Sequence, residues 1–400
     1  SSSLFKRFIT EKYSDRREKT SGDIVNIIQN EVGRFYSYLY DTMVLFIEII
    51  FSASIIITLL YFNFFVTLYI ITISFLFGVA YKLFFGKRLK YYGEKRQNLE
   101  FLTTNKIIES VSLFKEIKVF KKEQPFYIDF KKVNEKRYFF ASRYMTLNQF
   151  SRYFVEIVFI IILVTSLGFS LLLDLDLKDQ IPSISLFLAA SLRLIPSMNR
   201  IISSFQTRKY FYPSVQIITD NWLENKLELK DENSKISDFQ SSIIFENISF
   251  SYDSKKALLK SLKIEISKNQ ILGVKGESGV GKSTVFDIIL NLLDLDECRV
   301  KVDGKEIKRD DLSSNFFGFV PQKIYLLNQN IYKNIAFDAD DENLDINLID
   351  DYMSKIGLKE FIGDFDRKLG EGGGKVSGGQ KQKIGILRAF YNDSKVLLFD

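Results

Sequence analysis

A glycine-rich segment that starts at Gly276 has the residue types that bind phosphate. Its sequence, GESGVGKST, fits the pattern G-x-x-x-x-G-K-[ST]. The glycines permit a backbone ring whose N–H groups point at phosphate, and a helix that begins there adds partial positive charge. Lys282 is placed to meet the β- and γ-phosphates, and the Ser283 hydroxyl to bind Mg²⁺. The segment predicts an ATP site formed by Gly276, Ser278, Gly279, Val280, Gly281, Lys282, Ser283 and Thr284.

The elements around this loop support that prediction. The apolar run 271–274 predicts a strand before the loop, and a helical pattern follows it. Without this context the alternative is a glycine-rich turn with a chance Lys-Ser pair. A second apolar run, 396–399, predicts a buried central strand of a parallel sheet and leads into Asp400. Because α/β proteins bind ligands at the carboxyl ends of parallel strands, the Asp400 carboxylate is expected at a ligand-binding edge of the sheet. Its place after such a strand resembles that of the Walker B aspartate of P-loop NTPases, and this resemblance implies that Asp400 holds Mg²⁺ through water.

Two further motifs lie between the loop and Asp400. VPQ places Gln322 directly after a predicted apolar strand at 316–320. KVSGGQKQK contains Ser377, which begins a predicted helix that runs through Arg388. An isolated SGGQ has the alternative of a simple helix N-cap. The complete order of phosphate loop, glutamine, SGGQ and apolar strand with aspartate resembles the ATP-binding cassette of ABC transporters.

The resemblance implies roles for residues outside the loop. Gln322 would bind Mg²⁺ and act as a hinge toward a membrane domain, and Tyr252 would stack on adenine. Lys282, Gln322 and Asp400 would form the catalytic group. The SGGQ signature would face the phosphate loop of a second copy, so that ATP is bound between two cassettes. Its residues are Ser377, Gly378, Gly379 and Gln380.

The resemblance also bears on the ends of the sequence. In ABC transporters a glutamate that polarises the attacking water follows the strand aspartate, and a histidine that senses the γ-phosphate follows later. This sequence ends at Asp400, contains no histidine, and begins SSS without methionine. We therefore expect a piece of a longer protein, truncated at both ends.

The first half of the chain predicts a membrane domain. Four apolar runs of about 20 residues are each long enough to cross a ~30 Å hydrocarbon core. The segments 1–42 and 86–152 are rich in Lys and Arg, which places them in the cytoplasm together with the ATP site. The net charge of +6 lies mostly on these segments, and because they flank membrane spans they argue against a nucleic-acid-binding protein. The four apolar spans argue against a soluble cassette ATPase. The predicted spans are 43–62, 64–85, 154–173 and 181–205.

The expected fold is an all-α transmembrane domain followed by an α/β cassette. We place the membrane domain at 1–228, a polar linker at 229–242 and the cassette at 243–400. By resemblance to six-helix ABC exporter subunits, the four spans would be the third to sixth helices. Short coupling segments would lie at 20–27 and 112–123, where pairs of helices turn back in the cytoplasm. The single cysteine, Cys298, excludes an intrachain disulfide and a multi-cysteine metal site.

Three arginines in or beside the spans are the candidate substrate residues. Arg193 and Arg200 are about two helical turns apart and project from nearly the same face, and Arg152 starts the preceding span. An arginine inside a span costs a few kcal/mol unless it faces a wet cavity or an anion. Guanidinium groups suit a phosphate or pyrophosphate ligand. The alternatives are an ion pair of Arg193 with Glu48 or Glu156, and an interfacial position for the other two arginines.

The patterns SLFxxAxxRLxPSxNRI and RYFVE resemble the lipid-linked oligosaccharide flippases among bacterial ABC exporters. This resemblance implies a homodimer in the bacterial inner membrane, with cytoplasmic cassettes, that uses ATP to flip a polyprenyl-pyrophosphate-linked glycan. One alternative is an ABC exporter of another lipid, a peptide or a drug. An alternative of another class is a non-hydrolysing ATP-gated channel or regulator.

Overall fold

The computed structural model describes residues 2–14, 19–62, 64–172, 177–223, 236–251, 258–293, 295, 298–313, 315–337, 344–359 and 367–400. The chain divides into two compact units. One contains residues 1–11 and 15–227, and the other contains 12–14 and 228–400. The first unit is helical, and the second combines strands with helices.

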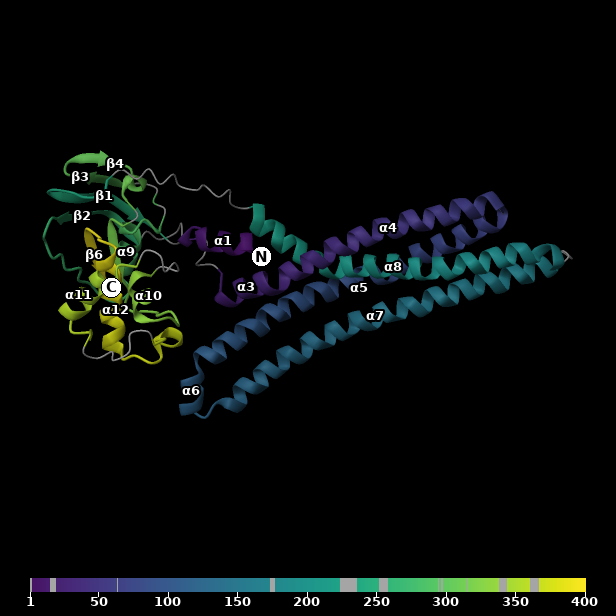
Figure 1. Ribbon diagram of the computed structural model, residues 1–400, viewed down its shortest axis with the longest axis horizontal. Coiled ribbons are helices and arrows are strands. Elements are labelled where there is room, and N and C mark those ends of the chain that lie inside the picture. The colour runs from purple at the N-terminus through teal and green to yellow at the C-terminus, as the bar shows by residue number, and fades with distance from the viewer. Residues whose placement is uncertain are drawn as a thin grey trace. The chain divides into compact units, whose positions relative to one another are not determined.

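Four long helices dominate the described part of the first unit (Figure 1). The helix α4 packs mainly against α8, and α5 packs mainly against α7. These pairings place residues far apart in the sequence side by side. The helices are α1 (Ser2–Thr10), α3 (Ser21–Asn26), the π-helical turn η1 (Ile27–Glu31), α4 (Val32–Phe62), α5 (Phe64–Ser112), α6 (Phe114–Val119), α7 (Glu123–Leu172) and α8 (Leu177–Leu223).

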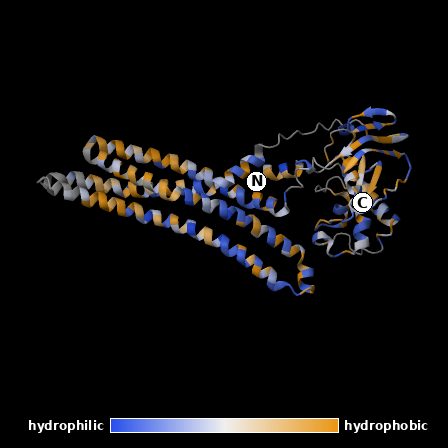
Figure 2. Cartoon of the chain, turned by 180° about the vertical axis from the view of Figure 1, so that it is seen from behind, coloured by the Kyte–Doolittle hydropathy of each residue, from blue (hydrophilic) through white to orange (hydrophobic). Residues whose placement is uncertain are grey.

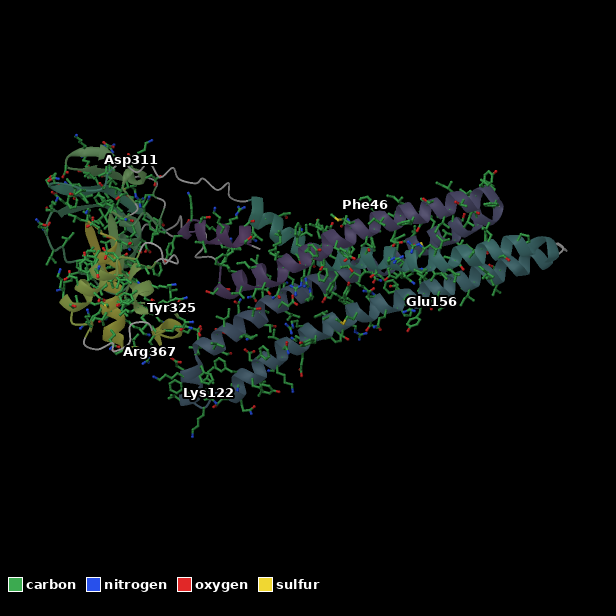
Figure 3. All side chains as sticks on the ribbon, in the orientation of Figure 1. Phe46, Lys122, Glu156, Asp311, Tyr325 and Arg367 are labelled. Atoms are coloured by element: carbon green, nitrogen blue, oxygen red, sulfur yellow. The ribbon has the colours of Figure 1, made fainter. Side chains whose placement is uncertain are left out.

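The long helices are apolar over one part of their length. Apolar residues gather toward the turn between α4 and α5, and polar residues toward α6 (Figure 2). Many apolar side chains of α4 are exposed, for example Phe46 at 63% (Figure 3), as expected where the surroundings are hydrocarbon. Within the described residues, Ser21–Phe62 and Glu123–Thr165 are long and apolar enough to cross a membrane. The spans predicted at 64–85 and 181–205 lie within α5 and α8 and remain predictions.

The two segments predicted to couple the domains form short helices. The helix α3 begins at a capping box in which Thr20 accepts from the Asp23 backbone N–H. Asn105 of α5 contacts both residues, since its Oδ1 accepts from Thr20 and its Nδ2 donates to Asp23. The backbone of Gly22 approaches Asn105 so closely that a Cβ there would clash. In the other segment α6 separates α5 from α7, and the chain reverses direction between them.

The second unit contains two sheets in its described residues. The antiparallel sheet has the order β2-β1-β3-β4, and a parallel pair joins β5 to β6. The helix α9 packs in the core between the sheets with Phe245 and Phe316, which are fully buried. The strands are β1 (Ser242–Phe250), β2 (Leu259–Ser267), β3 (Arg299–Val302), β4 (Lys305–Ile307), β5 (Phe317–Val320) and β6 (Val396–Phe399). The helices are α9 (Lys282–Ile289), α10 (Ile331–Ala336), α11 (Ile346–Lys355) and α12 (Gly378–Tyr391). Two short 3₁₀ turns are η2 (Arg309–Asp311) and η5 (Glu371–Gly373).

Two expectations for the strands are wrong. The run 271–274 forms no strand, and Ile271 is 99% exposed. Apolar residues alone do not make a strand, because a strand also needs a hydrogen-bonded neighbour, and this run pairs with none of the described strands. β6 is parallel to β5 and its Val396 and Leu398 are buried, as predicted, but it is not a central strand here. It pairs with β5 alone among the described strands, and Phe399 is 53% exposed.

The predicted linker, 229–242, is described only from Ile236. Ile236 forms an isolated parallel bridge to Leu312, and β1 begins at Ser242. Between them, Asp303 accepts hydrogen bonds from the backbone N–H groups of Gln240, Ser241 and Ser242. The end of the predicted linker is therefore held by side-chain and backbone contacts with the cassette.

Candidate nucleotide-binding site

The loop before α9 contains two glycines in the left-handed region of backbone space. The φ angle is 82° at Gly279 and 106° at Gly281. A Cβ at Gly281 would also lie 3.3 Å from the Leu258 side chain, which would have to shift slightly, so the positive φ is the main reason for glycine there. The Nζ of Lys282 donates to the backbone oxygens of Gly276 at 2.9 Å and of Glu277 at 2.7 Å. The loop therefore holds the lysine ammonium beside the N-terminus of α9.

The helix α9 is fixed to the core by its apolar face. Val285, Ile288 and Ile289 are buried among the strands, while Lys282 and Ser283 lie in the first turn. The N–H groups of a first helical turn have no partner within the helix and attract anions. The sequence therefore anchors one face of α9 and leaves its N-terminus for phosphate.

The parallel pair brings Asp400 to the same place. Phe399 of β6 lies opposite Val320 of β5, and the Asp400 backbone N–H donates to the Val320 oxygen at 3.1 Å. The Ser283 hydroxyl donates to Asp400 Oδ1 at 3.1 Å. The predicted Mg²⁺ ligands from the loop and from the strand are therefore direct neighbours.

These residues fit Mg²⁺. A hydroxyl and a carboxylate are the oxygen ligands that this ion takes from proteins, and phosphates and water complete its shell. Gln322 is exposed and follows β5, at the sheet edge from which Asp400 emerges. Among the described residues, no group of three or more acidic, histidine or cysteine side chains is arranged to hold a metal ion. Any Mg²⁺ here would consequently be held by few protein groups together with the nucleotide.

The predicted helix at SGGQ is confirmed as α12, and Ser377 is its N-cap. Ser377 Oγ accepts from the Gln380 N–H at 3.3 Å, and Gln380 Oε1 accepts from the Ser377 N–H at 2.7 Å. The cap is thus real, but it leaves the Ser377 hydroxyl proton free to donate. Gly378 and Gly379 have open space where a Cβ would point. An anion can therefore approach the backbone N–H groups of this turn.

The chain does not bring all predicted nucleotide residues together. Ser283 and Asp400 make contact, whereas no hydrogen bond among the described residues joins the SGGQ turn to the loop at 276–283. Tyr252, the predicted adenine-stacking residue, lies outside the described residues.

Sequence reasoning missed the role of Arg388 as an anchor for the segment that follows Gln322. Its guanidinium donates to the backbone oxygens of Tyr325 at 2.9 Å and Asn334 at 2.6 Å, and to Asn334 Oδ1 at 3.0 Å. It also lies over the Phe337 ring, and burial lowers the pKa of its guanidinium. Arg388 therefore ties the signature helix α12 to the segment after Gln322. The feature of the sequence that could have predicted this role is an arginine on the apolar face of the helix that begins at SGGQ.

The two units match two parts of one family. Residues 259–400 match the ABC transporter family, and residues 1–193 match the ABC transporter transmembrane region. The chain belongs to the ABC transporters. Its order of a helical membrane region followed by a cassette is the order of an ABC exporter subunit.

Several known ABC transporters are similar to this one. The ATP-dependent lipid A-core flippase of Desulfotalea psychrophila is 33% identical over 44% of this chain and 32% of its own length. The lipid A-core flippase of Salmonella typhimurium is 25% identical over 79% of this chain and 55% of its own. The mitochondrial iron-sulfur clusters transporter ATM1 of Saccharomyces cerevisiae is 31% identical over 40% of this chain and 24% of its own length. The chain therefore spans between about a quarter and about half of these relatives.

The fold also resembles a solved ABC exporter structure. A bacterial Atm1-family ABC exporter with ATP bound superposes with a TM-score of 0.81 at 19% identity. The match covers all of this chain and 71% of the other. This likeness concerns the fold.

In this ABC transporter the three candidate substrate arginines have different surroundings. Arg152 Nε lies 3.2 Å from Glu156 one turn along α7, and Arg200 Nε lies 2.6 Å from Glu48 on α4. Arg193 instead stacks over the ring of Phe51 at 5.1 Å. The alternative that Arg193 pairs with Glu48 or Glu156 is wrong, because the rotation of α8 presents Arg200 to Glu48.

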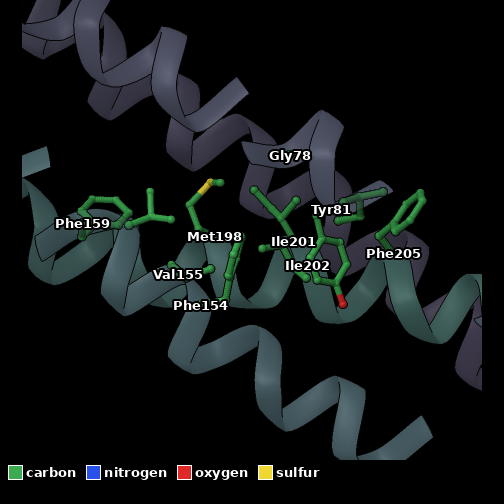
Figure 4. Close-up of a pocket in the computed structure, with 11 residues that line it drawn as sticks. Gly78, Tyr81, Phe154, Val155, Phe159, Met198, Ile201, Ile202 and Phe205 are labelled. Carbon is green, nitrogen blue, oxygen red and sulfur yellow. The ribbon is translucent and has the colours of Figure 1, made fainter. Parts of the chain in front are cut away.

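Among the cavities of the described residues, two apolar ones lie between the membrane helices, and none of the three arginines lines either. One, of about 230 Å³, is lined by Tyr81, Phe154, Met198 and Phe205 among others (Figure 4). The second, of about 500 Å³, contains Ser52 and Thr67 in an otherwise apolar wall. Both cavities have the size and polarity to hold hydrocarbon, such as a lipid chain.

Proposed function

We propose that the full-length protein is an ATP-driven exporter in which two copies bind ATP between their cassettes. The contact between Ser283 and Asp400, beside the Lys282 ammonium, carries this proposal. Lys282 would hold the β- and γ-phosphates, and Mg²⁺, when bound, would neutralise charge that develops on them. Ser283, Asp400 and Gln322 would hold the ion, and Ser377 and Gly379 would meet the γ-phosphate of the other copy. Tyr252 would stack on adenine.

Closure of the cassettes would be passed to the membrane domain by α3 and α6. The basic segments favour a cytoplasmic position for both short helices and the cassettes, and the membrane would be the inner membrane of a bacterium. The contacts of Asn105 with the cap of α3 support a rigid coupling element, since they fix α3 on the long helix α5. Movement of α3 would therefore be carried into α5.

The proposed substrate is a polyprenyl-pyrophosphate-linked oligosaccharide or a similar anionic lipid. Arg193 has no carboxylate partner among the described residues, and it lies in a predicted span, where an isolated cation is costly. A phosphate group would offset that cost, and Arg152 and Arg200 would assist. The apolar cavities suit the lipid chain. Relatives named as lipid A-core flippases support a lipid substrate in general.

The test is flipping of a fluorescent polyprenyl-pyrophosphate glycan by the full-length protein in proteoliposomes. Arg193→Ala should reduce ATP-dependent flipping and leave basal ATPase activity intact. Lys209→Ala is the matched control, because Lys209 also lies on α8 over an aromatic ring, Phe205, but beyond the predicted span. Normal flipping by Arg193→Ala would remove the pyrophosphate site. Absent ATPase activity in the wild-type protein would favour an ATP-gated channel or regulator, and ATPase activity stimulated only by drugs or peptides would favour the other exporters.

A further inference from the structure

The ion pair between Glu48 and Arg200 is asymmetric. The Glu48 side chain is only 7% exposed, whereas that of Arg200 is 45% exposed. The contact joins one nitrogen, Nε, to one oxygen, Oε1, at 2.6 Å, and Oε2 of Glu48 is buried without a hydrogen-bond partner. Two-pronged arginine–carboxylate pairs are stronger than single contacts. The carboxylate is therefore fixed in the helix interface, and the guanidinium is held by one bond with its other side open.

Two serines near the pair also lack partners. Ser52 is one turn beyond Glu48 on α4, and Ser197 is one turn before Arg200 on α8, so each shares a helix face with a member of the pair. Both side chains are at least nine-tenths buried, and both hydroxyl oxygens are without a hydrogen-bond partner. Buried polar groups normally have partners. Neither hydroxyl bonds Glu48 in this structure, so each would donate to its carboxylate only after a change of side-chain rotamer, once the arginine is engaged elsewhere.

The charge balance of the helix pair favours an additional anion. The predicted span of α4 carries one charged residue, Glu48, and that of α8 carries two, Arg193 and Arg200. Within these two spans there is therefore one carboxylate for two guanidiniums, and only Arg200 is in contact with it. An arriving phosphate would be attracted by both arginines and repelled by Glu48.

We propose that Glu48 is an internal counter-ion that competes with the transported anion for Arg200. This inference rests on the proposed anionic substrate and adds a residue that limits how tightly it is held. In the unloaded state Arg200 pairs with Glu48. When the anion binds, Arg200 turns to it, and Ser52 and Ser197 replace the arginine as partners of the carboxylate. Glu48 then recaptures Arg200 and promotes release.

The experiment measures binding of farnesyl pyrophosphate to the full-length protein in detergent, with farnesol as the uncharged control ligand. All variants carry Lys282→Ala, so that the nucleotide loop does not bind the probe. Glu48→Gln should bind farnesyl pyrophosphate at least about fivefold more tightly, within the range of typical coupling between sites. Glu48→Asp should give a smaller gain. Arg200→Gln should weaken binding, and the double variant with Glu48→Gln should behave like Arg200→Gln alone.

The matched control is Glu31→Gln. Glu31 is a fully buried carboxylate paired with Arg34 at 2.6 Å, but it lies outside the predicted spans. Any change in probe binding by Glu31→Gln therefore measures the general effect of removing a buried carboxylate on the folded protein. Ser52→Ala should weaken binding, because Glu48 loses a replacement partner, and this variant keeps the test informative if Glu48→Gln does not fold. Unchanged or weaker binding by a folded Glu48→Gln overturns the counter-ion role. If Arg193→Gln and Arg200→Gln both bind normally, the proposed anion site itself is wrong.

Discussion

Ser283 and Asp400 are joined by a hydrogen bond of 3.1 Å although 117 residues separate them. The bond links the first turn of α9 to the end of β6. It places a hydroxyl and a carboxylate, both suited to Mg²⁺, next to the lysine of the phosphate loop.

Replacing Ser283 by Ala should lower Mg²⁺-dependent ATP turnover of the full-length protein by about 10- to 100-fold, the usual effect of disturbing a metal site. Binding of ATP without Mg²⁺ should change little, because Lys282 and the loop are intact. Ser283→Thr is the control, since it retains the hydroxyl and should retain most activity. ATPase assays and nucleotide binding with and without Mg²⁺ measure both effects. Equal losses in the two binding assays would contradict a metal role.

Arg388→Gln should destabilise the cassette by about 2 kcal/mol, because charged hydrogen bonds to Tyr325 and Asn334 are lost. Arg388→Lys should be destabilised almost as much as Arg388→Gln, since an ammonium lacks the planar set of donors with which the guanidinium bonds several oxygens at once. Hydrogen exchange of the full-length protein should show faster exchange in α10 and in the segment after Gln322. The control is Lys355→Ala, which removes an exposed pair with Asp351 and a contact over the Tyr352 ring and should leave exchange in α10 unchanged.

Asp303 should make the start of β1 sensitive to acid. Backbone N–H groups of Gln240, Ser241 and Ser242 hold the pKa of Asp303 at about 2, below its ordinary value of 3.8. Because the folded pKa is depressed, the stabilisation is fully present above pH 3.8 and is lost as the pH falls through about 2. Hydrogen exchange at 240–242, corrected for intrinsic rates, should show protection that declines over this window. Asp303→Asn should show weak protection at every pH, and a persistent pH-dependent loss in that variant would assign the effect to another group.

Arg193→Lys should recover only part of the flipping activity that Arg193→Ala loses, because an ammonium retains the charge without the two-pronged geometry. Arg193→Ala and Arg200→Ala should also combine non-additively if they hold one ligand. The proteoliposome flipping assay measures both effects at matched expression. Additive losses would indicate that the two arginines act at separate sites.

The membrane topology can be checked with introduced cysteines. The native Cys298 is first replaced by Ala. Burial raises the pKa of the Cys298 thiol and slows its reaction with maleimide. Replacing Cys298 removes the remaining background labelling. A cysteine at position 176, between the predicted spans 154–173 and 181–205, should react with a membrane-impermeant maleimide from the periplasm, and one at Lys121 only from the cytoplasm. The reverse pattern would refute the cytoplasmic position of α6.

Much of the cassette fold could be predicted from the sequence because several of its elements are marked by local sequence motifs. Ser377 and Gln380 form a capping box within one turn, and that motif alone predicted where α12 begins. The glycines of the loop similarly predicted a tight backbone curve before α9. The run 271–274 was misjudged because strand formation depends on a partner elsewhere in the chain.

The sequence by itself determined the family, the order of a helical membrane region and a cassette, and the residue types at the nucleotide site. Motif spacing and apolar runs are local patterns of a few residues, and for that reason they can be recognised without the fold. Only the tertiary structure decided that Ser283 meets Asp400, that Arg388 anchors the segment after Gln322, and that Glu48 pairs with Arg200 while Arg193 stacks on Phe51. These pairings depend on how each helix is rotated and how closely it packs against its neighbours, and that is set by the whole fold rather than by any short stretch of chain.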